Sequence, residues 1–253
     1  MSTLLLKLAG PLQSWGTTSR FTRRTTQPAP SRSGVLGMIA AAQGRRRTDP
    51  LTDLLDLRFA VRVDQAGKLE RDFQTSRTLD GSRSMPLTDR YYLSDAVFVA
   101  GIEGPGTLVD GIEQALRRPV FPLYLGRRSC PPAGAVVVGQ RDDGLYGALA
   151  AEPWHAAAWW RRREERRPGG PAPLDLLADA GVVPPGLVRE ATQTHRDVPV
   201  SFDPELREYA WRQVERVTVT PPGVGRTAPG GVDHDPMSLT EPEHDVMALL
   251  EED

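Results

Sequence analysis

Gly10-Pro11-Leu12-Gln13-Ser14-Trp15-Gly16 follows directly on an apolar run at residues 4–8 and is the most informative stretch of this chain. A short strand breaks here into a turn that has a glycine at each end and a glutamine and a tryptophan inside it. Glycine lets a backbone turn sharply and approach a ligand closely. Tryptophan offers a flat face to a nucleobase, and glutamine can hydrogen-bond to a base edge or a phosphate. A tryptophan after a strand also commonly anchors a core, so the turn alone leaves both roles open.

The segment Pro30-Ser31-Arg32-Ser33-Gly34-Val35-Leu36-Gly37 predicts the start of a helix. A helix that begins at Ser33 points its free backbone N–H groups, a serine hydroxyl and the Arg32 guanidinium at one place, and this combination suits a phosphate. The same residues also form an ordinary helix cap, which needs no ligand. Both interpretations remain open from this segment alone.

Two further segments are rich in arginine. In Leu125-Gly126-Arg127-Arg128-Ser129-Cys130-Pro131, adjacent arginines follow a glycine in a stiff loop, and each guanidinium can hold a phosphate through two hydrogen bonds. Residues 71–77 and 89–93 place aromatic, amide and guanidinium groups on an arm suited to wedging between bases or gripping a bent backbone. Surface arginines and mobile loops are common, so these segments also admit a role without a ligand.

The hydrophobic pattern predicts an α+β fold. Short apolar or alternating runs indicate strands, and a period of 3.6 residues indicates helices. The polar residues between the second and third strands predict an extended hairpin that reaches away from the body. The expected order is strand 3–9, helix 33–43, strand 54–63, hairpin 69–89, strand 91–102, helix 108–116 and strand 135–138. This succession is typical of the ferredoxin-like unit found in RNA-recognition modules.

A different pattern begins at residue 139. Residues 153–167 contain three tryptophans and a run of mixed charge that most simply faces water as a helix end or loop. Residues 198–202 and 211–219 predict two strands, paired with each other and added to the first unit. We therefore expect a palm at residues 1–140 with a thumb at about 69–92, an extension at 141–220 and a tail at 221–253.

Charge is distributed unevenly along the chain. The net charge is −2, but eight of the 33 acidic residues lie in residues 233–253, which contain no Lys or Arg. The rest of the chain therefore carries 31 basic and 25 acidic residues. A tail rich in Pro, Gly and acid is typical of disorder, and it leaves solubilisation or masking of a basic surface as open roles.

Cysteine content and hydropathy limit the class of protein. One cysteine, Cys130, excludes an internal disulfide and a cysteine-based zinc site. The longest apolar runs, residues 35–42 and 133–138, are too short to cross a bilayer. Neither a cluster of acids at metal-ligand spacing nor a P-loop pattern occurs. We expect a cytoplasmic protein without a metal or a cofactor.

Five segments, at residues 10–16, 30–37, 71–75, 92–98 and 125–131, occur in the order and spacing typical of one family. Over roughly residues 3–219, the chain resembles the CasD family of subunits of Cascade, the RNA-guided surveillance complex of type I-E CRISPR systems. Five motifs in register are far more specific than any one of them. The thumb is the part least like its relatives, and the acidic tail lies outside the family pattern.

The resemblance implies a non-catalytic RNA-binding subunit with a ferredoxin-like palm and a β-hairpin thumb. Its implied partners are the 5′ handle of the CRISPR RNA, the last backbone subunit and the large subunit of Cascade. Target DNA is reached only through the complex, and no membrane is involved. The residues implied for RNA binding are Gln13, Trp15, Gly16, Arg20, Arg32, Ser33, Gly34, Arg77, Arg127, Arg128 and Ser129.

A metal-independent ribonuclease is the main alternative, because related subunits of another CRISPR subtype cleave precursor RNA. Such an enzyme needs a general acid and a general base beside the RNA. No such pair is visible in the segments that carry the resemblance. The candidate acids and bases are His155, His195, Tyr91 and Tyr92.

A protein-interaction module is the third class. Exposed tryptophans commonly anchor interfaces, and three of them lie close together before the basic run. These candidate anchors are Trp154, Trp159 and Trp160.

Overall fold

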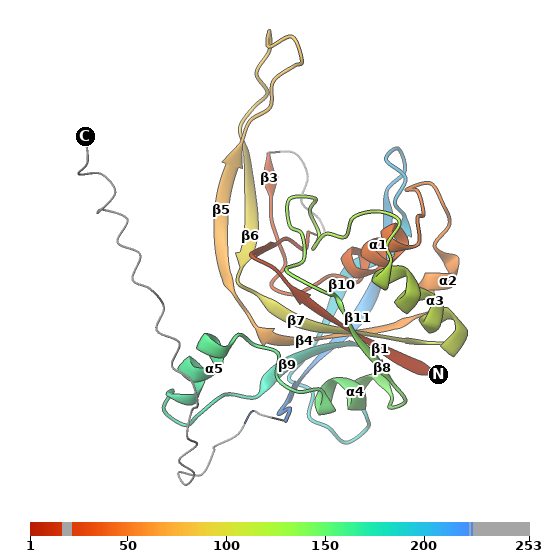
Figure 1. The fold of residues 1–253 in the computed structure, drawn as a ribbon, viewed down its shortest axis with the longest axis vertical. Coiled ribbons are helices and arrows are strands. Elements are labelled where there is room, and N and C mark those ends of the chain that lie inside the picture. The colour runs from red at the N-terminus through yellow and green to blue at the C-terminus, as the bar shows by residue number, and fades with distance from the viewer. Residues whose placement is uncertain (17–21, 223, 225–253) are drawn as a thin grey trace, which may run out of the picture.

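Two β-sheets with helices on both faces of the larger one make up the fold (Figure 1). The computed structural model describes residues 1–16, 22–222 and 224. Within them the larger sheet has seven strands in the order β10-β11-β9-β4-β7-β1-β8, and every pair in it is antiparallel. None of the helices in these residues is both long and apolar enough to span a membrane.

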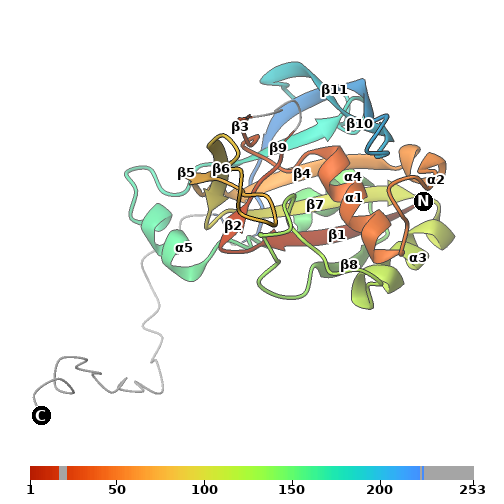
Figure 2. The same cartoon turned by 90° about the horizontal axis from the view of Figure 1, so that it is seen from above.

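The first half of the chain confirms the expected succession of strands and helices. Its central strands lie in the order β4-β7-β1-β8, and α1 and α3 cover one face of them (Figure 2). The bounds are β1 Ser2–Ala9, α1 Arg32–Ala42, β4 Arg58–Gln65, β7 Val97–Gly104, α3 Gly106–Arg117 and β8 Val137–Arg141. A short helix, α2 (Thr52–Leu55), precedes β4, so the strand expected from residue 54 starts four residues later.

The single strand expected at residues 91–102 is two strands. Asp95 adopts a positive φ of 54°, which turns the chain between β6 (Thr88–Ser94) and β7. As a result β6 leaves the larger sheet and pairs with β5 (Lys68–Gln74), and this hairpin carries an arm that extends from the body (Figure 1). β2 (Leu12–Gln13) and β3 (Arg23–Arg24) complete the second sheet on the other side of β6.

The C-terminal strands extend the larger sheet beyond β4. β10 (Ala191–Ser201) pairs with β11 (Glu208–Val219), which confirms the predicted pairing of these two segments. They join the sheet through β9 (Leu174–Asp179), a strand that the sequence pattern did not predict. Two short helices precede it, α4 (Leu145–Ala151) against the sheet and α5 (Ala158–Glu165), none of whose residues is buried.

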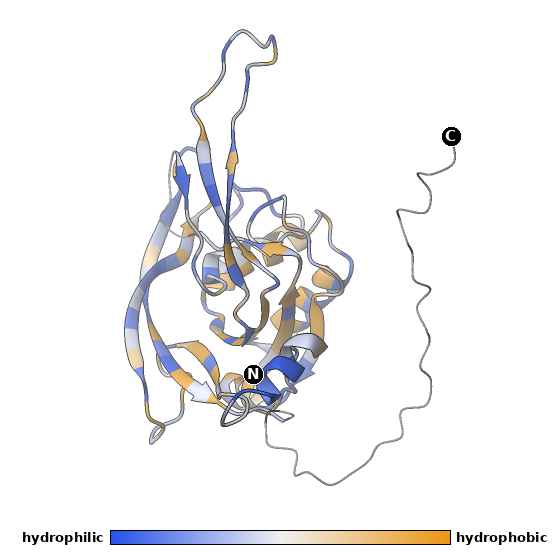
Figure 3. Ribbon diagram, turned by 90° about the vertical axis from the view of Figure 1, so that its left-hand side faces the viewer, coloured by the Kyte–Doolittle hydropathy of each residue, from blue (hydrophilic) through white to orange (hydrophobic). Residues whose placement is uncertain are grey.

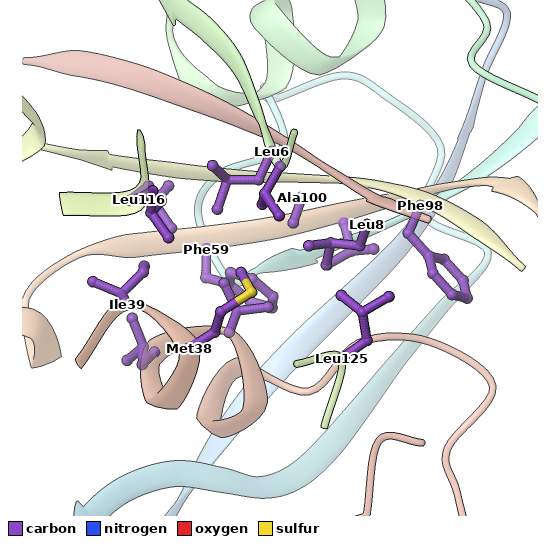
Figure 4. Close-up of a cluster of buried hydrophobic side chains, with 14 of the residues drawn as sticks. Leu6, Leu8, Met38, Ile39, Phe59, Phe98, Ala100, Leu116 and Leu125 are labelled. Atoms are coloured by element: carbon purple, nitrogen blue, oxygen red, sulfur yellow. The ribbon is translucent and has the colours of Figure 1, made fainter. Parts of the chain in front are cut away.

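Alternation along β1 divides the core between the two faces of the sheet. Leu4, Leu6 and Leu8 pack with α1 and α3, whereas Leu5 packs toward α4 on the opposite face. Figure 4 shows the first of these clusters, which contains Leu6 and Leu8 of β1 and Met38 of α1. All residues of β7 are buried, because it lies in the middle of the sheet with helices on both faces.

Candidate nucleic-acid interface

The turn that opens the candidate site is held by its own buried side chains. The Gln13 amide nitrogen donates to the carbonyl oxygens of Leu8 at 3.1 Å and Ala96 at 2.7 Å. The indole N–H of Trp15 donates to the Gln13 amide oxygen at 3.1 Å, and both side chains are almost fully buried. These two side chains thus leave no free face for a base, and Trp15 is a core anchor. Gly16, at the end of the turn, is exposed.

The start of α1 is likewise partnered within the chain. The Arg32 guanidinium donates to Asp179 at 3.0 Å and to the Leu57 carbonyl oxygen at 2.8 Å, and its backbone N–H donates to Asp197 at 2.7 Å. The Asp197 carboxylate therefore already occupies the place at this helix N-terminus where a phosphate was expected. Burial lowers the pKa of Arg32.

Ser33 and Gly34 serve the packing of the same helix. Ser33 is buried, and its hydroxyl lies 3.4 Å from the hydroxyl of the capping residue Ser31. A Cβ built at Gly34 would lie 2.8 Å from the Trp15 ring, so a glycine is needed for the ring to pack there. Arg32, Ser33 and Gly34 thus all contact the protein itself, although Nε of Arg32 is buried without a hydrogen-bond partner among the described residues. A ligand contact of these three residues stays a prediction.

The arginine loop docks directly on the turn. The Ser14 N–H donates to the Leu125 carbonyl oxygen at 3.1 Å. Gly126 has a φ of +86°, and a Cβ built on it would lie 1.8 Å from the Ser14 carbonyl oxygen. Only glycine permits both this conformation and this approach. The structure therefore brings together two segments, 10–16 and 125–131, that lie far apart in the sequence.

Arg127 is held in place by two contacts with the second sheet. Its guanidinium carbon lies 4.7 Å from the centre of the Tyr92 ring, and one of its terminal nitrogens donates to the Arg24 carbonyl oxygen at 2.9 Å. Its neighbours Arg128 and Ser129 are exposed. The loop thus presents one fixed arginine and one free arginine side by side.

Arg24, Arg90 and Arg127 form what we term the basic cluster. β3 and β6 pair in parallel with Arg24 beside Arg90, and Arg127 reaches across to this pair. Nε of Arg90 and Nη1 of Arg127 are buried and have no hydrogen-bond partner within the described part of the chain. Buried polar nitrogens are nearly always hydrogen-bonded, so these two N–H groups are suited to oxygen atoms of a bound ligand.

Sequence reasoning missed Arg24 and Arg90 as site residues. Arg24 stands in a run of arginines between the turn and α1, which marked the loop as basic but did not single out one residue. Arg90 is half-buried on β6, and only the pairing of β6 with β3 brings it to the cluster. The remaining predicted residues lie elsewhere. Arg77 is exposed on the arm, in a bridge to Ser84, and Arg20 falls outside the described residues.

The arm carries both hydrophilic and hydrophobic residues along its length (Figure 3). On one side of its base, the Arg23 guanidinium carbon lies 5.4 Å from the centre of the Tyr91 ring, and Arg71 forms a 2.9 Å ion pair with Asp89. Phe73, on the same strand as Arg71, is exposed. Aromatic and guanidinium groups are therefore presented outward here, as residues 71–93 predict.

The two candidate catalytic histidines lie apart from each other and from the basic cluster. His155 pairs with Glu152 at 2.8 Å just before α5, whereas His195 lies on β10 with its Nε2 3.2 Å from the Gln193 amide oxygen. Tyr92 is buried under Arg127. Among the described residues, no hydrogen bond joins either histidine to either tyrosine.

The three tryptophans considered as interface anchors differ in their surroundings. Trp154 is a core residue whose indole N–H donates to the Asp64 carbonyl oxygen at 2.8 Å. Trp159 is half exposed on α5 and makes an edge-on contact with Trp160. The Arg163 guanidinium carbon lies 3.9 Å from the centre of the Trp160 ring. Only the pair on α5 is therefore available at the surface.

Comparison with known proteins identifies the family. The sequence model of the family described as CRISPR-associated protein (Cas_Cas5) matches residues 3–215. The CRISPR system Cascade subunit CasD of Escherichia coli strain K12 is 33% identical over 174 residues, which cover 60% of this chain and 78% of that protein.

Solved structures agree with this assignment. A chain of a structure titled CRISPR RNA-guided surveillance complex is 37% identical and superposes with a TM-score of 0.69 over 86% of this chain and 90% of its own. A second, titled Crystal structure of Cas protein, is 36% identical with a TM-score of 0.65 over 86% of this chain and 94% of its own. Because the family model and the CasD relative agree with the shared fold, the chain belongs to the Cas5 family of CRISPR-associated proteins, together with the CasD subunit of Cascade.

Proposed function

We propose that this chain is a non-catalytic, RNA-binding subunit of a type I-E Cascade complex that holds the 5′ handle of the CRISPR RNA. Its CasD relative is named as a Cascade subunit, and one structural relative comes from an RNA-guided surveillance complex. In this role the chain contacts the backbone and large subunits of the complex, and through them the target DNA.

The palm and thumb of this proposal correspond to parts of the fold. The strand order β4-β7-β1-β8, with α1 and α3 as the two crossover helices, supports a ferredoxin-like palm over residues 1–140. The β5–β6 hairpin and its arm are the thumb, and residues 141–220 supply the added strands. The tail after residue 224 lies outside the described residues.

The basic cluster carries the proposal. Two buried guanidinium nitrogens that have no partner among residues 1–16, 22–222 and 224 lie where the arginine loop meets the second sheet. An RNA phosphate supplies acceptor oxygens in pairs, which match the planar donors of arginine. The stacking of Arg127 on Tyr92 fixes the donor before the RNA arrives, so less conformational entropy is lost on binding.

The predicted site residues divide into two groups in this proposal. Arg127, Arg128 and Ser129 contact the handle, with Gly16 beside them and Arg77 on the thumb. The other group holds this surface in shape through its hydrogen bonds and packing within the protein. Its members are Gln13, Trp15, Arg32, Ser33 and Gly34.

A non-catalytic role is supported by the separation of the acid–base candidates. Strand cleavage at a 2′-hydroxyl needs a base and an acid on opposite sides of one phosphate. His155 is paired with Glu152, and His195 lies on β10 beside Gln193. Neither arrangement brings an acid–base pair to the basic cluster.

The proposal is tested by incubating the purified chain, without metal, with labelled precursor CRISPR RNA. Gel shift and cleavage are scored on the same sample, with a scrambled handle as the control. A shift that requires the handle and leaves the RNA intact is expected. Specific cleavage would instead make the chain a processing nuclease, and equal binding of the scrambled RNA would remove handle recognition.

The double variant Arg127→Ala/Arg128→Ala locates the site. It is expected to weaken handle binding. The slope of log binding constant against log salt concentration is expected to become less steep by about 0.7 for each phosphate that no longer has an arginine partner. The matched control is Arg161→Ala/Arg162→Ala, an adjacent and exposed pair on α5 that removes the same charge elsewhere. An equal effect of both pairs would show a general charge effect and would remove the loop from the site.

A further inference from the structure

A cavity of about 240 Å³ lies on the α1 side of the larger sheet, beside the start of that helix. Its floor is apolar and is formed by Val61 of β4, Leu177 of β9 and Val214 of β11. The polar residues that line it are Gln27, Ser31, Asp175, Gln193, His195, Asp197, Arg212 and Arg216. Both arginines are paired with a carboxylate, Arg212 with Asp197 and Arg216 with Asp175. Neither the turn, the arginine loop nor the arm contributes to it.

Strand register explains why these side chains share one face. Val61 lies opposite Leu177, and Gln193 lies opposite Val214. Alternation along each strand then turns these residues to the same side of the sheet. Pro28 and Pro30 line the opposite wall, and the fixed φ of proline makes that wall stiff. The result is a slot between a flat apolar floor and a rigid roof.

The polar groups of the slot suit an uncharged ring rather than an anion. The charge of Arg216 is balanced by Asp175, which accepts two hydrogen bonds from it at 3.0 and 2.9 Å. Burial lowers the pKa of His195, so its ring is neutral at pH 7 and offers one donor and one acceptor. Gln193 adds an amide with both functions. Donors and acceptors around an apolar floor are what a nucleobase edge and face require.

The roof of this cavity is continuous with the basic cluster. Arg24, whose carbonyl oxygen accepts from Arg127, lies four residues before Pro28. Between them, the Gln27 N–H donates to the Trp15 carbonyl oxygen at 2.8 Å and ties this segment to the turn. Four residues span at most about 14 Å, a distance that a few nucleotides of single-stranded RNA cover.

We propose that this cavity receives one unpaired nucleobase of the RNA whose backbone is held at the basic cluster. The base lies between the proline roof and the floor of Val61, Leu177 and Val214, with its edge toward Gln193 and His195. This inference rests on the proposed function for its ligand, and it adds a base-reading pocket on the C-terminal strands to the phosphate site.

Abasic substitution along the handle tests the pocket with the full chain. Each position of a synthetic handle RNA is replaced in turn by an abasic nucleotide, and the dissociation constant is measured. One position is expected to lose about tenfold in affinity through the pocket, within the range for a stacked base. In Gln193→Ala/His195→Ala that loss is expected to become smaller, because the contacts to the base edge are gone and only stacking remains, while the losses at other positions persist.

The matched control is Thr192→Ala/Thr194→Ala, on the opposite face of the same strand. It is expected to keep the wild-type profile. A Gln193→Ala/His195→Ala profile equal to that of the wild type at every position would overturn the pocket, and so would a uniform loss of affinity.

Failure of the proposed function gives a different result. In that case the wild-type chain does not bind handle RNA, and the four nucleoside monophosphates are tested as probes by thermal shift. Stabilisation that Gln193→Ala/His195→Ala abolishes would mean that the cavity takes a base from free nucleotides. Absence of any shift would overturn the pocket. If another protein subunit covered the cavity in the assembled complex without RNA, that result would also overturn the base pocket.

Discussion

The Trp15 ring packs against Gly34 of α1, and its indole N–H donates to the Gln13 amide oxygen. Its removal therefore leaves a large cavity beside Gly34. We expect Trp15→Ala to lower the free energy of unfolding by about 3–5 kcal/mol. Urea unfolding measures this loss. RNA affinity per folded molecule is expected to fall far less than in Arg127→Ala/Arg128→Ala, because the ring does not contact the RNA. A variant of normal stability with weakened RNA binding would instead place the ring against a base.

Gly126 and Gly81 form a natural pair for testing how the arginine loop docks. Both have a positive φ, but a Cβ at Gly126 would collide with the Ser14 carbonyl oxygen, whereas nothing lies within 4 Å of one at Gly81. Gly81→Ala is expected to cost about 1–2 kcal/mol for the left-handed backbone alone. Gly126→Ala adds the collision and is expected to cost more and to weaken handle binding. Equal effects of the two variants on binding would separate the docking of the loop from RNA recognition.

At the scale of residues, the sequence marked segments rich in arginine but not what each arginine contacts. Arg32 and Arg127 both stand within two residues of a glycine and of a serine. Arg32 is buried because Asp179, 147 positions later, comes to lie beside it. No local pattern contains that information. Arg127 has one nitrogen without a hydrogen-bond partner in the described part of the chain, because its neighbours there are a ring and a carbonyl oxygen.

At the scale of elements, one buried network joins α1 to the C-terminal strands. Arg212 of β11 donates to Asp197 at 2.6 and 2.9 Å and to Asp179 of β9 at 2.6 Å, and Asp197 accepts the N–H of Arg32. Asp197→Asn removes one of the two carboxylates that balance the buried charges of Arg212 and Arg32 and is expected to cost about 3 kcal/mol at pH 7. The exposed Asp142→Asn is the control, and urea unfolding gives both values.

The same network predicts a pH dependence. Burial would raise the pKa of Asp197, but the hydrogen bonds and charge of Arg212 outweigh it, and the pKa is lowered. A lowered pKa adds stability above the unfolded value of about 3.9, and this stability is lost as the pH falls through the folded-state pKa. The difference between wild type and Asp197→Asn is therefore expected to shrink below about pH 4. A constant difference from pH 7 to pH 3 would contradict this.

Elements with a strong local period were predictable, and those defined by their neighbours were not. The amphipathic α3 was predicted to within two residues. β9 was missed because its six residues follow a Gly-Gly-Pro break and become a strand by pairing with β4 and β11. The break between β6 and β7 was missed because Asp95, rather than a glycine, adopts the positive φ.

At the scale of the whole molecule, the contacts of residues 222 and 224 bear on where the predicted tail, residues 221–253, begins. Val224 is buried in the cluster between the sheet and α4. The backbone N–H of Trp154 donates to the Pro222 carbonyl oxygen at 3.3 Å. Truncation after Val224 is expected to leave the unfolding temperature and handle binding unchanged. Truncation after Pro221 removes both contacts and is expected to lower that temperature by a few degrees, at about 1 kcal/mol for the buried valine. Differential scanning calorimetry compares the two, and equal values would show that residue 221 is the true boundary.

The overall architecture followed from the sequence more fully than the interface did. The hydrophobic periods predicted the order of the main strands and helices in the first half of the chain. The interface is assembled from β3, β6 and the loop at residues 125–131, which meet only after the two sheets have formed. That assembly depends on β-pairing over long sequence separations, which no short motif encodes.

The last strand of the larger sheet also bears on solubility. β10 has β11 on one side and no strand on the other within the described residues, and such an edge invites a second chain to pair with it. Pro199 offers no N–H for that pairing, and register shifts after Arg196 and after Pro199 break the regular ladder. The edge is therefore a poor template for amyloid-like growth and for pairing with copies of the same chain.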